Sequence, residues 1–340
     1  MLRFDESYYQ EVIRKHHYDP MDFNPIDFGL NSVEPKSLQF KWLCHYKGNE
    51  FSEAFEKGKP CIVTTGIGLS GIPHLGTLSQ ILRAIFLQQN GLKVQVVLGD
   101  LDSYNARNQP LEVVVERAEQ YKEFIKRLGF SETMGILRAQ YDQTEILRTA
   151  YLISKVLRDI DFKEAEEDLS ELYQRKGIYP GIEFPVKQAI LLMTADFIHL
   201  GRVDGYTNIL ITLGLEEHLY VQIANKVVER MQYPFKIGSM YSRIIKGFNG
   251  YPKMSKSIPE SSITVNMPYE KMSQMIMEQE GTYAEPIDSV VYQMMCAVSY
   301  YTIEELEELY NICEHGGNAW LNAKKKYCGM LYEICSAWDF

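Results

Sequence analysis

A glycine-rich segment at residues 66–77 is the first part of this sequence whose residue types could do chemistry. It contains Gly66, Gly68 and Gly76, together with His74 and Thr77. Glycines let backbone N–H groups approach a ligand closely, and a helix N-terminus favours negative charge, so the segment predicts a bound phosphate or nucleotide with His74 as a donor. The alternative is a tight turn with a structural histidine. The spacing matches neither the G-x-G-x-x-G fingerprint nor the P-loop, since no Lys-Ser or Lys-Thr follows.

A second group of reactive residue types lies in the loop Lys253–Ser257, which contains two lysines and two serines. The surrounding stretch, residues 231–259, carries five basic residues and no acidic one, in a chain whose net charge is −10. Ammonium groups on a loop suit a polyphosphate whose charge grows in the transition state. Taken alone, a solvated basic loop is the competing interpretation.

The glycine-rich segment is expected to join elements of an α/β sheet. The β-branched run 61–65 indicates a buried strand, the apolar spacing over 78–89 indicates a helix, and 94–98 indicates a second strand. Such a βαβ unit has parallel strands, and its glycine turn lies at the carboxyl end of the sheet, where ligands bind. We therefore predict a Rossmann-type doubly wound parallel sheet.

Further elements divide the chain into three parts. Helices are expected over 112–128, 144–175 and 218–231, and a strand over 209–213. The predicted domains are an N-terminal extension with short helices at 1–58, a catalytic α/β domain at 59–266 with a helical connecting segment at about 136–183, and an all-helical C-terminal domain at 267–340. In the last of these, Thr302 and Glu305 fit a capping box, and Gly316 should end the helix.

The composition excludes several classes of protein. With 46% apolar and 24% charged residues the chain is typical of globular proteins, and its acidity argues against a generally basic nucleic-acid-coating protein. The six cysteines form no Cys-x-x-Cys pair, so reduced, mostly buried thiols are expected. No window approaches the roughly 18 apolar residues of a membrane span. We expect a soluble, cytoplasmic protein that does not bind a membrane.

Together the two loops resemble the paired signatures of the class I aminoacyl-tRNA synthetases. Pro73–Thr77 resembles the HIGH signature, and Lys253–Ser257 reproduces KMSKS letter for letter. The chain is most similar to the tyrosyl/tryptophanyl subgroup, from about Pro60 to the C-terminus. Four further segments carry this likeness: Gly99–Tyr104, Phe184–Ala189, Gly214–Glu217 and Ser261–Ile263.

The resemblance implies a two-step reaction. ATP and an amino acid would form an aminoacyl-adenylate and pyrophosphate, and the acyl group would then pass to the terminal ribose of a tRNA. Mg²⁺ would accompany ATP, no metal-ligating protein residues are expected, and a homodimer is implied. The implied catalytic residues are His74, Thr77, Lys253 and Lys256. The implied ATP-binding residues are Gly66, Gly68, Gly76, Gly214, Glu216, Ser255 and Ser257. The implied amino-acid-binding residues are Thr64, Asp102, Phe184, Gln188 and Glu217.

The departures from the subgroup cluster where the amino-acid side chain is read. Thr64 and Phe184 stand at positions of family tyrosines, and Glu217 stands at that of a glutamine. The usual substrate-hydroxyl aspartate would be Leu191 in a gapless alignment, and Asp196 could replace it only with a short insertion. A buried polar contact discriminates by about 10⁴–10⁵, so these changes could alter the substrate outright.

Three functions therefore stay open. The first is an aminoacyl-tRNA ligase with tryptophan as the leading substrate and tyrosine next. The second is a synthetase-like ligase that adenylates a different amino acid, or passes it to a non-tRNA acceptor in a biosynthetic pathway. The third is a catalytically silent tRNA-binding paralogue, against which the intact His74, Lys253 and Lys256 argue.

The remaining candidates have ordinary structural interpretations. Asp100 and Asp102 either line the pocket or cap the next helix, and His199 and His218 lie in apolar surroundings typical of structural histidines. The run 324–326 of three lysines could contact tRNA phosphates, although a solvated face is favoured. The methionines at 254 and 272–277 are expected to be packing residues.

Overall fold

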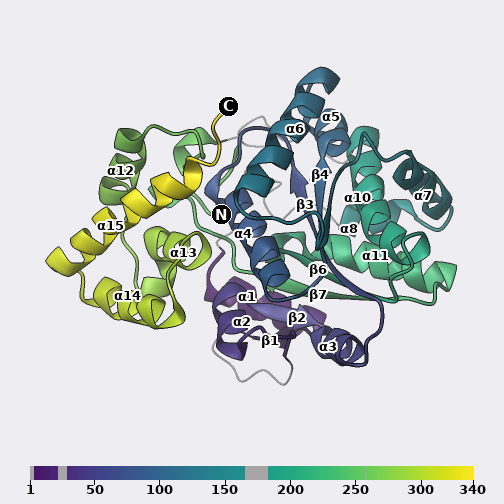
Figure 1. The fold of residues 1–340 in the computed structure, drawn as a ribbon, viewed down its shortest axis with the longest axis horizontal. Helices are drawn as coiled ribbons and strands as arrows, with labels where there is room; N and C mark the ends of the chain where they lie inside the picture. Colours follow the sequence, from purple (N-terminus) through teal and green to yellow (C-terminus); the bar gives the residue numbers. More distant parts are fainter. Residues whose placement is uncertain (1–3, 22–28, 165–182, 257) are drawn as a thin grey trace. The chain divides into compact units, whose positions relative to one another are not determined.

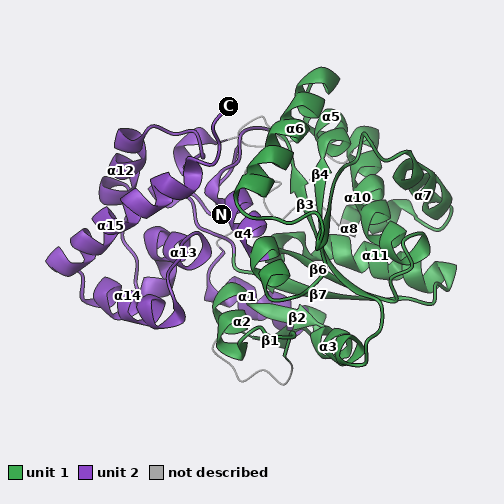
Figure 2. Ribbon diagram, in the orientation of Figure 1, with its two compact units in different colours: residues 1–2, 16–70, 84–243 green, residues 3–15, 71–83, 244–340 purple. Residues whose placement is uncertain are grey.

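The computed structural model describes residues 4–21, 29–164, 183–256 and 258–340. The chain forms two compact units, which Figure 2 colours separately. Unit 1 comprises residues 1–2, 16–70 and 84–243, and unit 2 comprises residues 3–15, 71–83 and 244–340. The segment that carries His74 is therefore assigned to the same unit as the Lys253–Ser257 loop, and each unit is described by itself below.

Unit 1 is built on a mixed sheet of seven strands in the described residues, with the order β1-β2-β7-β6-β3-β4-β5 (Figure 1). Strands β3 to β7 are parallel to one another, whereas β2 is antiparallel to both β7 and β1. The parallel part has the Rossmann strand order, in which connections leave the first strand in both directions. The strands are β1 Asp19–Pro20, β2 Cys44–Tyr46, β3 Cys61–Gly68, β4 Val94–Gly99, β5 Gly135–Ala139, β6 Asn208–Gly214 and β7 Lys236–Ser242.

Helices of unit 1 pack against this sheet, including α3, α6, α10 and α11. Helix α4, Leu75–Gln89, begins in unit 2 and ends in unit 1. Among the described residues, the helices that lie wholly in unit 1 are α2 Pro35–Lys41, α3 Gly48–Glu56, α5 Asp100–Arg107, α6 Leu111–Arg127, α7 Thr144–Ser154, α8 Asp159–Glu164, α10 Phe184–Arg202, η1 Leu215–Glu217 and α11 His218–Met231.

The central prediction of an α/β fold with a doubly wound parallel sheet is confirmed. The runs expected at 61–65, 94–98 and 209–213 are the buried strands β3, β4 and β6, with β3 lying parallel between the other two. Continuous β-branched and apolar runs form these strands because helices cover parallel sheets and no alternation with solvent is needed.

Three expectations about local structure were wrong in part. The segment from about residue 136 was expected to be helical, but it begins with strand β5, a five-residue strand that pairs with β4. The extension 1–58 was expected to hold short helices, and besides these it contributes β1 and β2 to the sheet edge beside β7. The helix expected over 144–175 is divided into α7 and α8, and its part beyond residue 164 lies outside the described residues.

Unit 2 is helical in its C-terminal part. Its elements are most of α1 Glu6–His16, η2 Phe248–Gly250, η3 Pro259–Ser261, α12 Tyr269–Glu278, η4 Pro286–Asp288, α13 Val290–Ala297, α14 Ile303–His315 and α15 Gly317–Cys335. The predicted capping box is present at the start of α14, where the Thr302 side chain accepts from Glu305 N and the Glu305 carboxylate accepts from Thr302 N. Gly316 ends the helix, as predicted.

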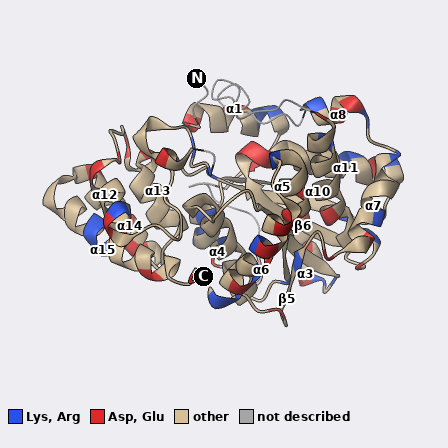
Figure 3. Ribbon diagram, turned by 90° about the horizontal axis from the view of Figure 1, so that it is seen from above, with Lys and Arg blue, Asp and Glu red and all other residues tan. Residues whose placement is uncertain are grey.

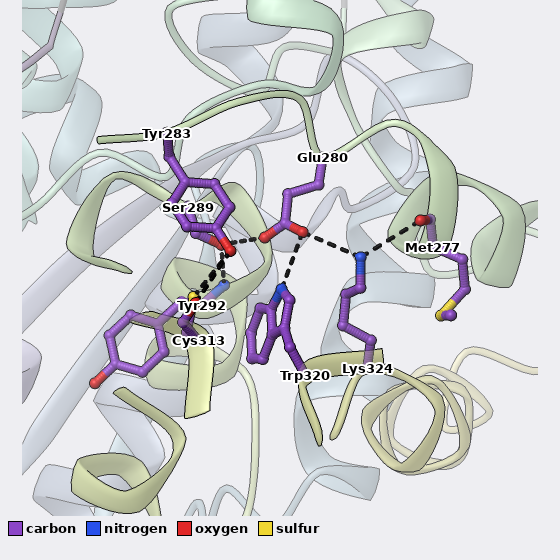
Figure 4. A network of polar contacts seen from close by, with 8 residues as sticks. All are labelled: Met277, Glu280, Tyr283, Ser289, Tyr292, Cys313, Trp320 and Lys324. Atoms are coloured by element: carbon purple, nitrogen blue, oxygen red, sulfur yellow. Dashed lines mark hydrogen bonds and ion pairs between the residues drawn. The ribbon is translucent and has the colours of Figure 1, made fainter. Parts of the chain in front are cut away.

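A buried polar network joins α12, α13 and α15 through Glu280 (Figure 4). The carboxylate of Glu280 accepts from Lys324 Nζ at 3.1 Å and from Trp320 Nε1 at 3.2 Å, and also from the Ser289 hydroxyl. The side chains of Lys324 and Glu280 are only 6% and 8% exposed. Lys324 is therefore a structural residue of this unit, which separates it from its two exposed neighbours in the lysine run.

The surface of the C-terminal helices carries both signs of charge. Figure 3 shows acidic residues along α14 and basic residues along α15. All six cysteines are free, and four of them are buried, in agreement with the predicted reduced thiols. Among the helices that the structure describes, none is long and apolar enough to cross a membrane.

Candidate active site

The segment that carries His74 pairs with the chain that follows the Lys253–Ser257 loop. Within unit 2, His74 forms an antiparallel bridge with Thr264. Leu75 N donates to Ile263 O at 3.1 Å, and Val265 N donates to Pro73 O at 2.9 Å. Backbone hydrogen bonds thus fix the His74 segment to residues 263–265, which follow the lysine loop, and the sequence did not reveal this pairing.

The imidazole of His74 is held as a neutral hydrogen-bond donor. Thr77 N donates to its Nδ1 at 3.1 Å, so Nδ1 is the unprotonated nitrogen and Nε2 carries the proton. Burial lowers the pKa of His74 to about 3, and the positive charges of Lys256 and then Lys253 act in the same direction. Gly76 is required for this arrangement, since a Cβ there would lie 2.8 Å from Cε1 of the imidazole.

The loop with the two lysines is anchored at Met254 and Ser255. Met254 is buried, as expected of a packing residue, and its N–H donates to Ile245 O at 3.2 Å. Ser255 N donates to Ser261 Oγ at 3.0 Å, and Ser262 Oγ donates to Ser255 O at 3.4 Å. This anchoring leaves Lys253 and Lys256 partly exposed, while Ser257 lies outside the described residues.

Lys256 lies alongside the start of the His74 segment. A Cβ built on Gly71 would meet the Cδ of Lys256 at 3.7 Å, which is an ordinary van der Waals distance. Its charge also contributes to the low pKa of His74. One imidazole N–H donor and nearby ammonium groups therefore belong to one compact unit, an arrangement suited to phosphate oxygens.

The predicted nucleotide-binding positions of unit 1 lie at the ends of two adjacent strands. Gly66 and Gly68 close β3, and a Cβ on either would meet nothing within 4 Å, so the backbone there faces open space. Gly214 ends β6, and the carboxylate of Glu216 folds back so closely that a Cβ on Gly214 would collide with it. Glu216 and Glu217 are both half-buried in η1.

The residues predicted to read the amino acid do not share one environment. Thr64 is fully buried and its Oγ1 accepts from Gln95 Nε2 at 2.9 Å. Phe184 is 70% exposed at the start of α10, and Gln188 is exposed one turn further on. Leu191, the position given by the gapless alignment, packs against an apolar cluster of unit 1.

Asp102 belongs to a buried polar cluster with Gln140 and Asp196, which we call the carboxylate pair site. Gln140 Nε2 donates to Asp102 Oδ2 at 2.9 Å and to Asp196 Oδ2 at 2.8 Å. Gln140 Oε1 accepts from Asp102 N at 3.1 Å. Burial raises the pKa of Asp102 to about 7, and burial followed by the nearby Asp102 charge raises the pKa of Asp196 well above its ordinary value.

Sequence reasoning missed Gln140 and reached Asp196 only through an insertion. The available signals were a lone carboxylate in the apolar run of α10 and a glutamine directly after a strand. The question about Asp100 is answered as well. Its Oδ1 accepts from Leu101 N at 2.8 Å and Tyr141 N at 3.1 Å, so it orders the backbone, whereas Asp102 faces the cluster.

The two helical histidines have the expected structural partners. His199 Nδ1 lies 3.0 Å from Thr149 Oγ1, and His218 Nδ1 lies 2.9 Å from the Tyr18 hydroxyl. His16 Nδ1 and the Tyr18 hydroxyl also accept from Gln222 of α11. The N-terminal extension thus holds the start of α11, which gives that segment a role the sequence did not reveal.

The fold is that of an α/β protein with a Rossmann-type parallel core, and comparison with known proteins gives the family. The family model of "tRNA synthetases class I (W and Y)" matches residues 56–326, so the chain belongs to this family. This confirms the family expected from the signature motifs and the predicted class of synthetase-like ligase.

The relatives with curated names are tryptophan–tRNA and tyrosine–tRNA ligases, and their sequence identity to this chain is low. The tryptophan–tRNA ligase of Methanopyrus kandleri is 23% identical over 88% of this chain and 86% of its own length. That of Aeropyrum pernix is 25% identical over 70% of this chain, but the match spans only 63% of the relative. The tyrosine–tRNA ligase of Archaeoglobus fulgidus is 26% identical over 61% of this chain and 60% of its own length.

Solved structures agree on the fold. Tryptophanyl-tRNA synthetase from Aeropyrum pernix superimposes with a TM-score of 0.80 at 20% identity, over 98% of this chain and 92% of that one. Tyrosyl-tRNA synthetase from Archaeoglobus fulgidus gives a TM-score of 0.72 at 18% identity, over 89% of this chain and 98% of that one. The fold is shared by enzymes named for two different amino acids, so the fold alone does not specify the substrate.

Proposed function

We propose that this protein activates an amino acid with ATP and transfers it to tRNA. The observation that carries this proposal is the pairing of the His74 segment with residues 263–265, which follow the lysine loop inside unit 2, together with the proximity of Lys256 to Gly71. Family membership adds the reaction type, and the names of the relatives make tryptophan the first candidate substrate and tyrosine the second.

In the first step, a carboxylate oxygen of the amino acid forms a bond to the α-phosphorus of ATP. The bond from that phosphorus to the bridging oxygen breaks, and pyrophosphate leaves with the electron pair. The Nε2–H of His74 would donate to a phosphate oxygen, and Lys253 and Lys256 would stabilise the charge that grows on the leaving group. Mg²⁺ is expected to bind with the phosphates as part of the substrate. In the second step, a ribose hydroxyl of tRNA attacks the acyl carbon and AMP leaves.

His74 stays neutral at physiological pH under this proposal. A protonated imidazole beside two ammonium groups would add repulsion, and the low pKa of His74 prevents it. The remaining implied contacts, from Thr77, Gly214, Glu216, Gln188 and Glu217, are proposed on matched position alone.

The test is amino-acid-dependent ATP–pyrophosphate exchange across the twenty proteinogenic amino acids, followed by charging of bulk tRNA with any amino acid that supports exchange. We expect exchange with one amino acid and charging of tRNA with the same one. Folded protein that supports no exchange would contradict activation. Exchange without charging would contradict tRNA as the acceptor.

A second candidate is activation of an acid other than tryptophan or tyrosine. It is favoured by one specific observation, the carboxylate pair site, because two buried carboxylates with Gln140 are a poor match for a large neutral side chain. The same exchange panel separates the two candidates.

A further inference from the structure

The segment 214–217, which the proposed function assigns to the nucleotide, lies between two elements of unit 1. Gly214 ends β6, and His218 begins α11 directly after η1. The His218 N–H donates to Leu215 O, so the first residue of α11 closes the turn of η1. The Glu216 carboxylate folds back against Gly214. Whatever fixes the end of β6 and the start of α11 therefore also fixes this segment.

The N-terminal extension holds the start of α11 through Tyr18. The Tyr18 hydroxyl lies 2.9 Å from His218 Nδ1, and both side chains are buried. Gln222, one turn further along α11, donates through Nε2 to the Tyr18 hydroxyl at 3.2 Å and to His16 Nδ1 at 2.8 Å. Residues about 200 positions apart in the sequence are thus joined at the helix end that follows the segment 214–217.

The direction of these hydrogen bonds makes the Tyr18 hydroxyl the donor to His218. Burial raises the pKa of Tyr18, and the hydrogen bonds that its oxygen accepts from Gln222 and then Tyr241 oppose that rise. Because the oxygen already accepts two hydrogen bonds, its own hydrogen is the one directed to His218 Nδ1. A phenylalanine at position 18 would keep the ring and remove only this donor.

A second contact of the extension holds the end of β6. Trp42, which is 2% exposed, donates through Nε1 to Thr212 Oγ1 at 2.9 Å. Thr212 lies two residues before Gly214 on the same strand. This contact comes from a different part of the extension than Tyr18 does. Buried hydrogen bonds from the extension therefore hold the chain on both sides of the segment 214–217.

We propose that Tyr18 is a positioning residue for the nucleotide, because it holds the segment 214–217 in place through His218. The inference rests on the proposed function, which assigns Gly214 and Glu216 to ATP. A segment that is already ordered before the ligand arrives loses less conformational entropy on binding. Tyr18 should therefore contribute to the affinity for ATP and not to the affinity for the amino acid.

The first test is Tyr18→Phe in the full chain, with the KM for ATP and the KM for the amino acid measured separately in ATP–pyrophosphate exchange. We expect the KM for ATP to rise about 3–10-fold, the range for one neutral hydrogen bond, while kcat and the KM for the amino acid stay unchanged. Tyr327→Phe is the matched control. It removes a buried hydroxyl that donates to Val298 O at 3.0 Å among the helices of unit 2, and it should leave the KM for ATP unchanged.

A KM for ATP that rises equally in Tyr18→Phe and Tyr327→Phe would overturn the inference, since the effect would then be a general loss of structure. An equal rise of both KM values in Tyr18→Phe would overturn it as well.

The second test is calorimetry with ATP and Mg²⁺ in the absence of amino acid, which separates this inference from the proposed function. The wild type should bind ATP, and Tyr18→Phe should bind it about 3–10-fold more weakly. Gln222→Met, which removes the other donor of the same contact, should weaken binding in the same direction. Equal affinities of the wild type and both variants would contradict the role of Tyr18 and leave the proposed function intact. A folded wild type that binds no ATP would contradict the proposed function itself.

Discussion

At the scale of single residues, Lys256 is proposed to stabilise the transition state of adenylate formation more strongly than the ground state. It lies beside Gly71 and lowers the pKa of His74 through its charge. Lys256→Ala should lower the rate of adenylate formation by about 10²–10³, the scale for losing one transition-state donor, with little change in amino-acid affinity. Rapid-quench kinetics would measure the rate, and equilibrium dialysis the affinity.

The control for that substitution is Lys236→Ala. Lys236 is exposed on β7 and pairs with Glu50, so its loss should leave adenylate formation unchanged. Equal losses of rate and amino-acid affinity in Lys256→Ala would mean that the loop binds the ground-state substrate instead.

The raised pKa of Asp102 predicts a pH-dependent stability with a definite sign. In the unfolded chain the carboxyl ionises near 3.8, whereas in the folded protein it ionises near 7. Between these values the folded state holds a proton that the unfolded chain has lost, so stability falls as pH rises through this window. Asp102→Asn should therefore raise the free energy of unfolding at pH 8 by about 1–3 kcal/mol and flatten the dependence between pH 5 and 7.

Urea unfolding at pH 5 and pH 8 checks this prediction, with Asp142→Asn as an exposed control expected to change stability by less than about 0.5 kcal/mol. An Asp102→Asn variant that is less stable than the wild type at pH 8 would show that the carboxylate stabilises the fold. In that case Asp102 would be a structural residue and not one kept for a ligand.

At the scale of secondary-structure elements, one short run of lysines on α15 contains both buried and exposed side chains. Lys324 forms an ion pair with Glu280 in which both side chains are less than a tenth exposed, whereas Lys325 and Lys326 are exposed. Removing one partner of a buried pair leaves an uncompensated charge and costs about 3–5 kcal/mol. Lys324→Ala should therefore destabilise the protein by this amount, measured by chemical unfolding.

Lys325→Ala is the matched control on the same helix and should change stability by no more than about 0.5 kcal/mol. A double substitution of Lys324 and Glu280 by apolar residues of similar size should recover part of the loss, because no unpaired charge stays buried. Equal stabilities of Lys324→Ala and Lys325→Ala would contradict the network drawn in Figure 4.

The sequence predicted the elements that a local residue pattern encodes. It missed those that form only through contacts with distant parts of the chain. Strands β3, β4 and β6 and the capping box of α14 could be predicted because each is encoded within a few consecutive residues. Strand β2 has three residues and exists through its pairing with β7, which no local pattern announces. The same holds for Gln140, whose importance comes from two carboxylates on α5 and α10.

At the scale of the whole molecule, the net charge of −10 says little about the ligand, because charge is unevenly distributed along the chain. Residues 231–259 are basic and include the lysine loop of unit 2, while the carboxylate pair site places two acids in unit 1. The basic stretch fits the proposed ATP substrate, since a triphosphate requires cations. The family model accounts for residues 56–326, and the N-terminal residues before it complete the sheet of unit 1.

The measurement that tests the central claim most directly is ATP–pyrophosphate exchange by the full chain, run in parallel on the wild type and Lys256→Ala. The account predicts exchange that requires both ATP and one amino acid, and that falls by about 10²–10³ in the variant. Folded wild-type protein that shows no exchange with any amino acid, or a variant that exchanges as fast as the wild type, would contradict it.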